Sequence, residues 1–199
     1  MPEPKAGSSV FKVGKVTTGT LEWTDKQVTV KAKIRGAVLR GDVTKKQAAA
    51  MGNTSARDYV LAHQPRWTKA SFEWLHLFGS ALGGPNALGN LVAGTFDANT
   101  QMLAVEQGLR NYCANDENDV TPQSPVYVTV TANLMDGTWI AEHIAFAAEH
   151  AGQELTSGSF SGITSSRYST LAFDIFGELA LGFALGSGGT DEDYSDRDD

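Results

Sequence analysis

The chain has 199 residues, of which 41% are hydrophobic and 20% are charged, enough to build one domain around a hydrophobic core. Cys113 is the only cysteine, which excludes a disulfide framework and a zinc site built from cysteines; no run of 18 or more uncharged apolar residues predicts a membrane span. The formal net charge of −7 argues against a surface that is basic throughout, as would be needed to bind phosphate backbones over all of it.

The charges are unevenly distributed along the chain. Residues 1–76 hold 13 Lys and Arg against 6 Asp and Glu, whereas residues 77–199 hold 3 against 17. Residues 186–199 contain six acidic residues, one arginine and almost no apolar side chain, a composition typical of a disordered tail. The charge of the whole chain is therefore a poor guide to the surface beside any one site.

The N-terminal residues predict a loose leader over 1–9. This stretch has no apolar run and no cleavage pattern, so we expect no Sec signal peptide. We expect synthesis in the cytoplasm, no association with a membrane, and any export by a route without a cleaved signal. A single domain is expected over residues 10–185, followed by the acidic tail over 186–199.

In chain order, the first predicted elements are strands. Apolar and polar residues alternate from Val28 to Ile34, which predicts a strand with one apolar face, and a second strand is expected around Leu21 to Trp23. A short helix is expected over residues 44–51, ended by Gly52 and Asn53. Ser55 is the candidate cap of a second helix over residues 56–63.

The middle and the end of the chain alternate between strand, loop and helix patterns. Residues 66–77 predict a strand, and the glycine-rich residues 78–94 predict a loop. Asp97 is a candidate cap for a helix over residues 99–112. Strands are expected over 126–133 and 139–146, and a packed helix over 167–185. These elements together predict an α+β domain with an antiparallel sheet.

The segment from Trp74 to Glu106 has the order strand, His, glycine-rich loop, Asn-Leu, and a helix that carries Asn and Glu. In this order it resembles the DNA/RNA non-specific endonuclease family within the ββα-metal (HNH-like) nucleases, in the compact form found in bacterial toxin domains. The resemblance covers roughly residues 66–146. The matching residues are His76, Asn90, Leu91, Asn99, Glu106 and Arg110.

This resemblance implies a ββα-metal nuclease core with surrounding helices and a metal-dependent endonuclease that hydrolyses phosphodiester bonds of DNA, RNA or both with low sequence specificity. His76 is then the general base, since a neutral imidazole can take a proton from water. Asn99 is the expected ligand of Mg²⁺ or Mn²⁺, and Glu106 is expected to hold a metal-bound water. Arg110 is expected to bind the scissile phosphate or to stabilise the charge of the transition state.

The loop before the helix has an expected structural role and one departure from the family. Asn90 is expected to pin the loop to the helix, while Gly83 and Gly84 allow the backbone to pass close to the metal and phosphate. The family has Asp-Arg-Gly-His where this chain has Glu73-Trp-Leu-His76, so the phosphate-binding arginine is missing. Arg66 and Lys69 are the candidates to replace its charge.

Each of these residues also has an ordinary structural interpretation. His76 can be a packed core residue, Asn99 a helix cap, and Glu106 and Arg110 a surface pair one helical turn apart. The alternative function is a non-catalytic nucleic-acid-binding or structural protein that retains the ββα scaffold; another is a metal-dependent hydrolase of a different phosphate ester. A toxin nuclease would in addition need an immunity protein as partner.

Two further patterns leave alternatives open. Glu142-His143 and Glu149-His150 repeat at seven residues, which favours a solvated helix over a metal site. Basic residues in the first predicted strands either follow a nucleic-acid backbone or form a solvated sheet face; they are Lys12, Lys15, Lys31, Lys33, Arg35 and Arg40.

Overall fold

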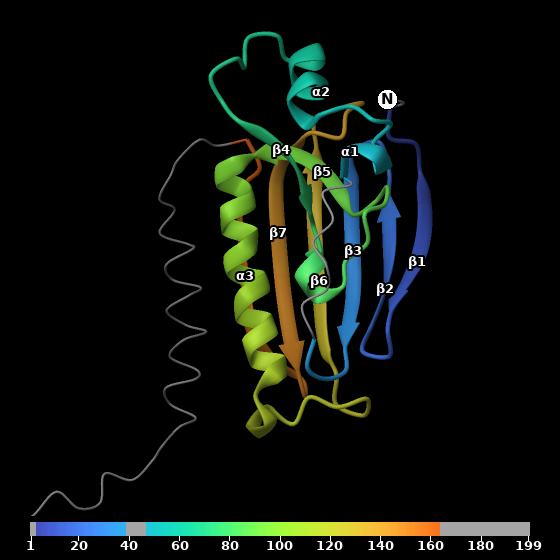
Figure 1. Ribbon diagram of the computed structural model, residues 1–199, viewed down its shortest axis with the longest axis vertical. Coiled ribbons are helices and arrows are strands. Elements are labelled where there is room, and N and C mark those ends of the chain that lie inside the picture. Colours follow the sequence, from blue (N-terminus) through green and yellow to red (C-terminus); the bar gives the residue numbers. More distant parts are fainter. Residues whose placement is uncertain (1–2, 39–46, 164–199) are drawn as a thin grey trace, which may run out of the picture.

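The computed structural model describes residues 3–38 and 47–163, and its frame is a six-stranded antiparallel sheet with the strand order β1-β2-β3-β6-β7-β8 (Figure 1). Neighbouring strands pair along most of their length, and the register shifts near the end of β6 and within β7. The strands are β1 (Gly7–Val13), β2 (Thr17–Trp23), β3 (Gln27–Ile34), β6 (Val126–Leu134), β7 (Ala141–His150) and β8 (Gln153–Ser161).

One face of this sheet is covered by a second layer (Figure 1). That layer contains the hairpin of β4 (Phe72–His76) and β5 (Leu91–Thr95), followed directly by the long helix α3 (Phe96–Ala114). Two short helices, α1 (Gln47–Ala50) and α2 (Ala56–His63), lie at one end. The single turns η1 (Ser80–Leu82) and η2 (Asp116–Asn118) complete the described elements.

The core lies between the two layers. Val28, Val30, Ala32 and Ile34 alternate along β3 and are at most 3% exposed, as their spacing predicts for one buried face. The hairpin is fixed against the sheet end by backbone hydrogen bonds from Ala93 N to Trp139 O (2.7 Å) and from Thr95 N to Gly162 O (2.8 Å). The sequence from β4 to α3 therefore stands as one ββα unit on the inner face of the sheet.

Most of the expected strands and helices form. The strands predicted around 21–23, 28–34, 126–133 and 139–146 fall in β2, β3, β6 and β7, and β6 pairs with β7. Ser55 caps α2, because its side chain accepts a hydrogen bond from Asp58 N at 3.0 Å. The fold is α+β, with a mostly antiparallel sheet and few helices in its described part.

Several expected boundaries are wrong. Residues 7–9 belong to β1 rather than to a leader, because they pair with β2. Of the strand expected over 66–77, only 72–76 is extended, and residues 91–94 of the expected loop form β5. β8 was not expected, since Gln153–Ser161 is rich in small polar residues and lacks a clear apolar alternation.

Two local expectations also fail. Thr95, and not Asp97, caps α3, since Ala98 N donates to Thr95 Oγ1 at 3.2 Å. The two Glu-His pairs lie on strand β7 and not on the solvated helix that we expected. On a strand, residues seven positions apart face opposite sides, so His143 is exposed and His150 is buried. Outside the described residues lie Arg40, the start of the helix expected from residue 44, the helix expected over 167–185 and the acidic tail.

No helix among the described residues combines the length and the apolar content that crossing a bilayer requires.

Candidate active site

The loop between β4 and β5 is closed at its base by Asn90, which is fully buried. Its amide oxygen accepts a hydrogen bond from Phe78 N (2.9 Å), and its amide nitrogen donates to Phe78 O (3.0 Å) and Pro85 O (2.9 Å). The backbone adds a bond from Leu77 N to Asn90 O at 2.9 Å. Asn90 thus pins the two ends of the loop to each other, in place of the link from loop to helix that we expected.

Glycines let this loop fold tightly against α3. Gly83 ends the η1 turn in the left-handed region with φ +94°, and a Cβ on Gly84 would lie 1.7 Å from Phe78 O. Gly79, which the sequence did not single out, is the closest to the chemistry. A Cβ there would lie 1.8 Å from the carboxyl carbon of Glu106, so only glycine allows this carboxyl group its place.

One helix face carries the polar residues of the site. Asn99, Leu103 and Glu106 follow one another at intervals of four and three residues, which places them on one side of α3. Asn99 lies one turn inside the helix and does not cap it, because Thr95 has that role. The interpretation of Asn99 as a cap is therefore wrong.

These helix residues face the end of β4 across a pocket of about 460 Å³. His76 comes from the last position of β4, and Glu73 lies three residues earlier on the same strand. Phe72, Trp74 and Leu103 supply apolar walls, while the remaining lining comes from α1, α2 and η1. The polar residues that line the pocket are Gln47, Ser55, Glu73, His76, Ser80, Asn99 and Glu106.

The imidazole of His76 is held by Asn86, a loop residue that the sequence did not indicate. His76 Nε2 lies 2.7 Å from Asn86 Oδ1, and an amide oxygen only accepts, so Nε2 carries the hydrogen and Nδ1 keeps its lone pair. Burial lowers the pKa of His76 below its usual 6.5, and the hydrogen bond to Asn86 opposes part of that shift. The ring is therefore neutral at pH 7 and able to accept a proton.

Glu106 is the most buried acidic side chain of the pocket, with 8% of its surface exposed. Among the described residues, no hydrogen bond is made to its carboxyl group, and burial raises its pKa to about 8. Arg110 lies one turn further along α3, half-buried and outside the lining of the pocket. The alternative interpretation of Glu106 and Arg110 as a surface pair gains no support from this pKa, since the cause of the shift is desolvation.

Glu73 orients the amide of Asn99. Asn99 Nδ2 donates to Glu73 Oε2 at 2.8 Å, so the amide nitrogen is occupied and Oδ1 is left as an acceptor. Sequence reasoning noted Glu73 only as a departure from the family motif. The signal that it belongs to the site is its charge, three residues before His76 on a strand whose neighbours are buried.

The cations expected at the site are not in its lining. Arg66 and Lys69 are exposed in the loop between α2 and β4, and no Lys or Arg of the described residues lines the pocket. The pocket is instead lined by oxygen atoms from the carboxyl groups of Glu73 and Glu106 and from the amide of Asn99. Such oxygens suit a hard divalent cation.

The fit to a cation is limited in one respect. In the described part of the chain, no group of three His, Cys, Asp or Glu side chains is close enough to hold a metal ion. A cation in this pocket would therefore have few protein ligands and keep several waters or substrate oxygens, which is the habit of Mg²⁺.

No protein-family model matches the chain, and no curated protein matches its sequence.

Proposed function

We propose that the chain is a metal-dependent endonuclease that hydrolyses phosphodiester bonds of DNA, RNA or both with low sequence specificity. The observation that carries the proposal is the convergence of His76, Asn99 and Glu106, expected from their order in the sequence, on one pocket. The neutral imidazole and the buried carboxyl group, which has no hydrogen-bond partner among the described residues, are features of catalytic sites more than of structural ones.

In this proposal, His76 is the general base. Its Nδ1 takes a proton from the water that attacks phosphorus, and the imidazolium formed keeps its Nε2–H donated to Asn86 Oδ1. Since that hydrogen bond favours the charged ring, Asn86 stabilises the product of the proton transfer and fixes the ring orientation. The depressed pKa of His76 keeps it unprotonated at neutral pH before each turnover.

Asn99 and Glu106 are the residues that would hold Mg²⁺ or Mn²⁺, Asn99 through Oδ1 and Glu106 through a water molecule. When bound, the cation neutralises charge on the phosphate and on the leaving oxygen. Glu73 keeps the Asn99 amide in the orientation that leaves Oδ1 available. Gly79 keeps Glu106 beside the loop, and Asn90 keeps the loop closed.

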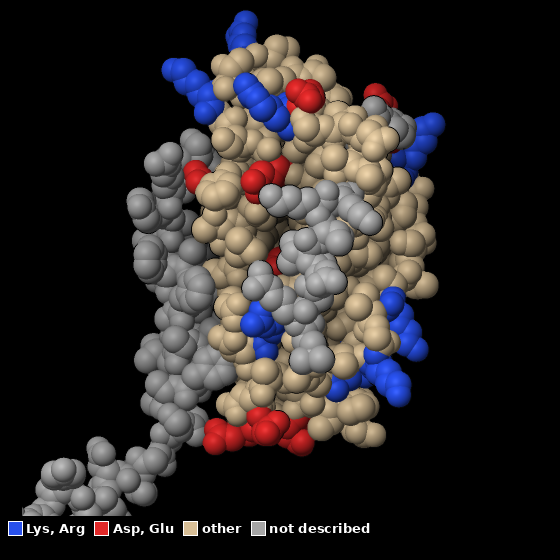
Figure 2. All heavy atoms as spheres, viewed as in Figure 1, with Lys and Arg blue, Asp and Glu red and all other residues tan. Residues whose placement is uncertain are grey.

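Substrate is expected to approach from the end of the molecule where α2 lies. In Figure 2, blue Lys and Arg side chains protrude at that end, although blue and red side chains also occur elsewhere on this face, and a group of red Asp and Glu side chains lies at the opposite end, where the chain leaves α3 in Figure 1. Arg66 and Lys69 belong to the loop after α2 and are exposed. We infer that they contact flanking phosphates rather than the scissile one.

The test is cleavage of supercoiled plasmid and of total RNA by the purified protein with Mg²⁺ or Mn²⁺. We expect nicking that EDTA and His76→Ala both abolish, while His143→Ala, a histidine exposed on β7, cleaves as the wild type does. Cleavage that survives His76→Ala would remove the pocket from consideration as the active site. Asn99→Ala then tests the proposed metal ligand.

One observation favours the alternative of a non-catalytic nucleic-acid-binding or structural protein. The pocket has two acidic residues and, among the described residues, no cation to bind the scissile phosphate. A folded protein that cleaves neither plasmid, RNA nor a small diester with any divalent metal would support this alternative. Cleavage of the small diester alone would indicate a hydrolase of another phosphate ester. A toxin role with an immunity partner stays a prediction.

A further inference from the structure

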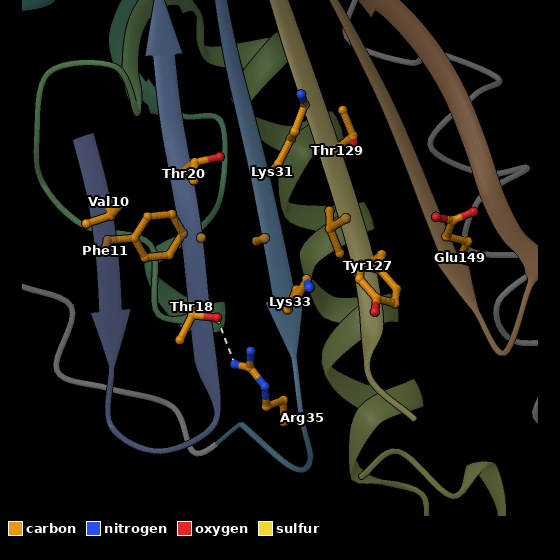
Figure 3. Close-up of a pocket in the computed structure, with 13 residues that line it drawn as sticks. Val10, Phe11, Thr18, Thr20, Lys31, Lys33, Arg35, Tyr127, Thr129 and Glu149 are labelled. Carbon is orange, nitrogen blue, oxygen red and sulfur yellow. Dashed lines mark hydrogen bonds between the residues drawn. The ribbon is translucent and has the colours of Figure 1, made fainter. Parts of the chain in front are cut away.

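The sheet face that points away from α3 contains a second, shallow pocket of about 630 Å³. Along β3, the buried positions Val30 and Ala32 alternate with exposed Lys31 and Lys33, so the two lysines project from the outer face. Figure 3 shows both on that face, with Arg35 beyond the end of β3. Three cations therefore follow one strand at intervals of two residues.

Two of these cations are held in place by uncharged partners. Arg35 Nη1 donates to Thr18 Oγ1 at 2.7 Å, drawn as the dashed line in Figure 3. The ammonium group of Lys33 lies 4.9 Å from the centre of the Tyr127 ring. Because neither partner carries a charge, the positive charge of Arg35 and Lys33 is positioned without being neutralised.

Two exposed acidic residues of β2 and β7 share this face, and neither pairs directly with a cation of the row: Glu22 on β2 lies opposite Thr29, two residues before Lys31 on β3. Among the described residues, Glu149 is the single acidic side chain that lines the pocket, and it lies on β7. Lys33 on β3 pairs with Tyr127 on β6, and Tyr127 pairs with Glu149 on β7. Strand β6 therefore lies between Glu149 and the cations of β3. Two strand spacings amount to about 10 Å, a Debye length at 0.1 M salt. The positive field therefore follows β3.

The spacing and composition of this face fit a single nucleic-acid strand. Side chains two residues apart on a strand repeat about every 7 Å, comparable to the separation of successive phosphates in an extended strand. Thr20 and Thr129 flank Lys31 and add hydroxyl donors. Tyr127 is 40% exposed and offers a ring on which a base can stack. A flat sheet face has no helix or ribbon to enter a duplex groove.

We propose that the outer face of β2, β3 and β6 is a second binding site, which takes the phosphate backbone of single-stranded DNA or RNA along Lys31, Lys33 and Arg35. The proposal takes the nature of the polyanion from the endonuclease function proposed above. The site lies across the sheet from His76, so it retains substrate near the enzyme and takes no part in bond cleavage.

The experiment measures binding of a fluorescently labelled oligothymidine in EDTA, where no cleavage occurs, as a function of salt. The double variant Lys31→Gln/Lys33→Gln is compared with Lys5→Gln/Lys26→Gln, which makes the same charge change at exposed positions outside the pocket. Each phosphate contact to a single strand contributes about −0.7 to the slope of log K against log salt. We expect the slope to lose about 1.4 and affinity to fall about 25-fold near 0.1 M salt.

The control pair is expected to leave slope and affinity as in the wild type, and Tyr127→Ala to weaken binding without changing the slope. Equal losses in both lysine pairs would overturn the proposal, because net charge alone would then explain binding. A duplex bound as tightly as the single strand would overturn it too. The proposal would also be overturned if Lys31→Gln/Lys33→Gln lost binding to poly-aspartate but still bound oligothymidine as the wild type does. That result is expected for a site that takes an acidic protein partner.

A second measurement separates this site from the catalytic one. Cleavage of a small phosphodiester with Mg²⁺ is expected to be unchanged in Lys31→Gln/Lys33→Gln, since the substrate is too small to reach both faces. If no variant cleaves any substrate but oligothymidine binding still depends on the two lysines, the endonuclease proposal fails and the second site stands. If cleavage occurs but oligothymidine binding does not depend on the two lysines, only the proposal of the second site fails.

Discussion

Replacing Glu106 by glutamine is expected to stabilise the protein at alkaline pH while it removes activity. Burial raises the pKa of Glu106 from 4.5 to about 8. In the folded state the carboxyl group therefore stays protonated across a range in which the unfolded chain releases the proton. Stability falls as pH rises from about 4.5 to about 8 and is constant above that range. Glutamine never ionises, so the variant escapes this loss.

The size of the effect follows from the shift. One pKa unit corresponds to about 1.36 kcal/mol, so a shift from 4.5 to about 8 corresponds to roughly 5 kcal/mol as an upper bound. This is a large fraction of the ~5–15 kcal/mol that stabilises an ordinary domain. Only 8% of the side chain is exposed, so solvent screens little of this effect. Near pH 5 the wild type and Glu106→Gln should be almost equally stable.

The assay is denaturant unfolding in EDTA at pH 5 and pH 9, followed by the fluorescence of the buried Trp74 and Trp139. Glu142→Gln, at an exposed position on β7, is the control and should show no difference that grows with pH. If the free energies of unfolding of wild type and Glu106→Gln differ by the same amount at both pH values, the reasoning is refuted. Loss of cleavage in a variant of raised stability would identify Glu106 as a residue kept for function.

Other expected outcomes test the rest of the pocket. Gly79→Ala should impair cleavage, because its Cβ would displace the Glu106 carboxyl group; since that group is the end of a flexible side chain, the loss of stability should stay below about 1–3 kcal/mol, and activity assays and denaturant unfolding check this. Asn90→Ala should cost roughly 2–5 kcal/mol, since it leaves buried Phe78 backbone groups without partners, and a variant as stable as the wild type would contradict the closure of the loop. The pH profile of kcat/KM should rise on its acid side at a pH below 6.5, and Asn86→Ala should move it lower still, because the bond to Asn86 raises the pKa of His76 and its loss favours the neutral base. Mg²⁺ at ten times its Kd should stabilise the wild type by about 1.4 kcal/mol but not Asn99→Ala, as thermal unfolding would show.

The pattern of the sequence determined the parts of this fold that depend on local periodicity. The alternation in Val28–Ile34 was enough to define the buried face of β3, because side chains of a strand point to opposite sides in turn. The spacing from Asn99 to Glu106 was enough to place both on one side of a helix. The order of His76, Asn99 and Glu106 along the chain also led to the pocket they share.

Tertiary structure decided what periodicity cannot. Glu73 and His76 are three residues apart on β4, so strand alternation assigns their side chains to opposite faces, yet both are half-buried and line the same pocket. Asn86 reaches His76 only because the loop folds back, with Asn90 and Gly84 at its base. Arg110 lies on the same side of α3 as Glu106 but does not line the pocket, which extends along the helix only from Asn99 to Glu106. The sequence alone determines which residues can share a face; the packing of hairpin on helix determines which of them meet.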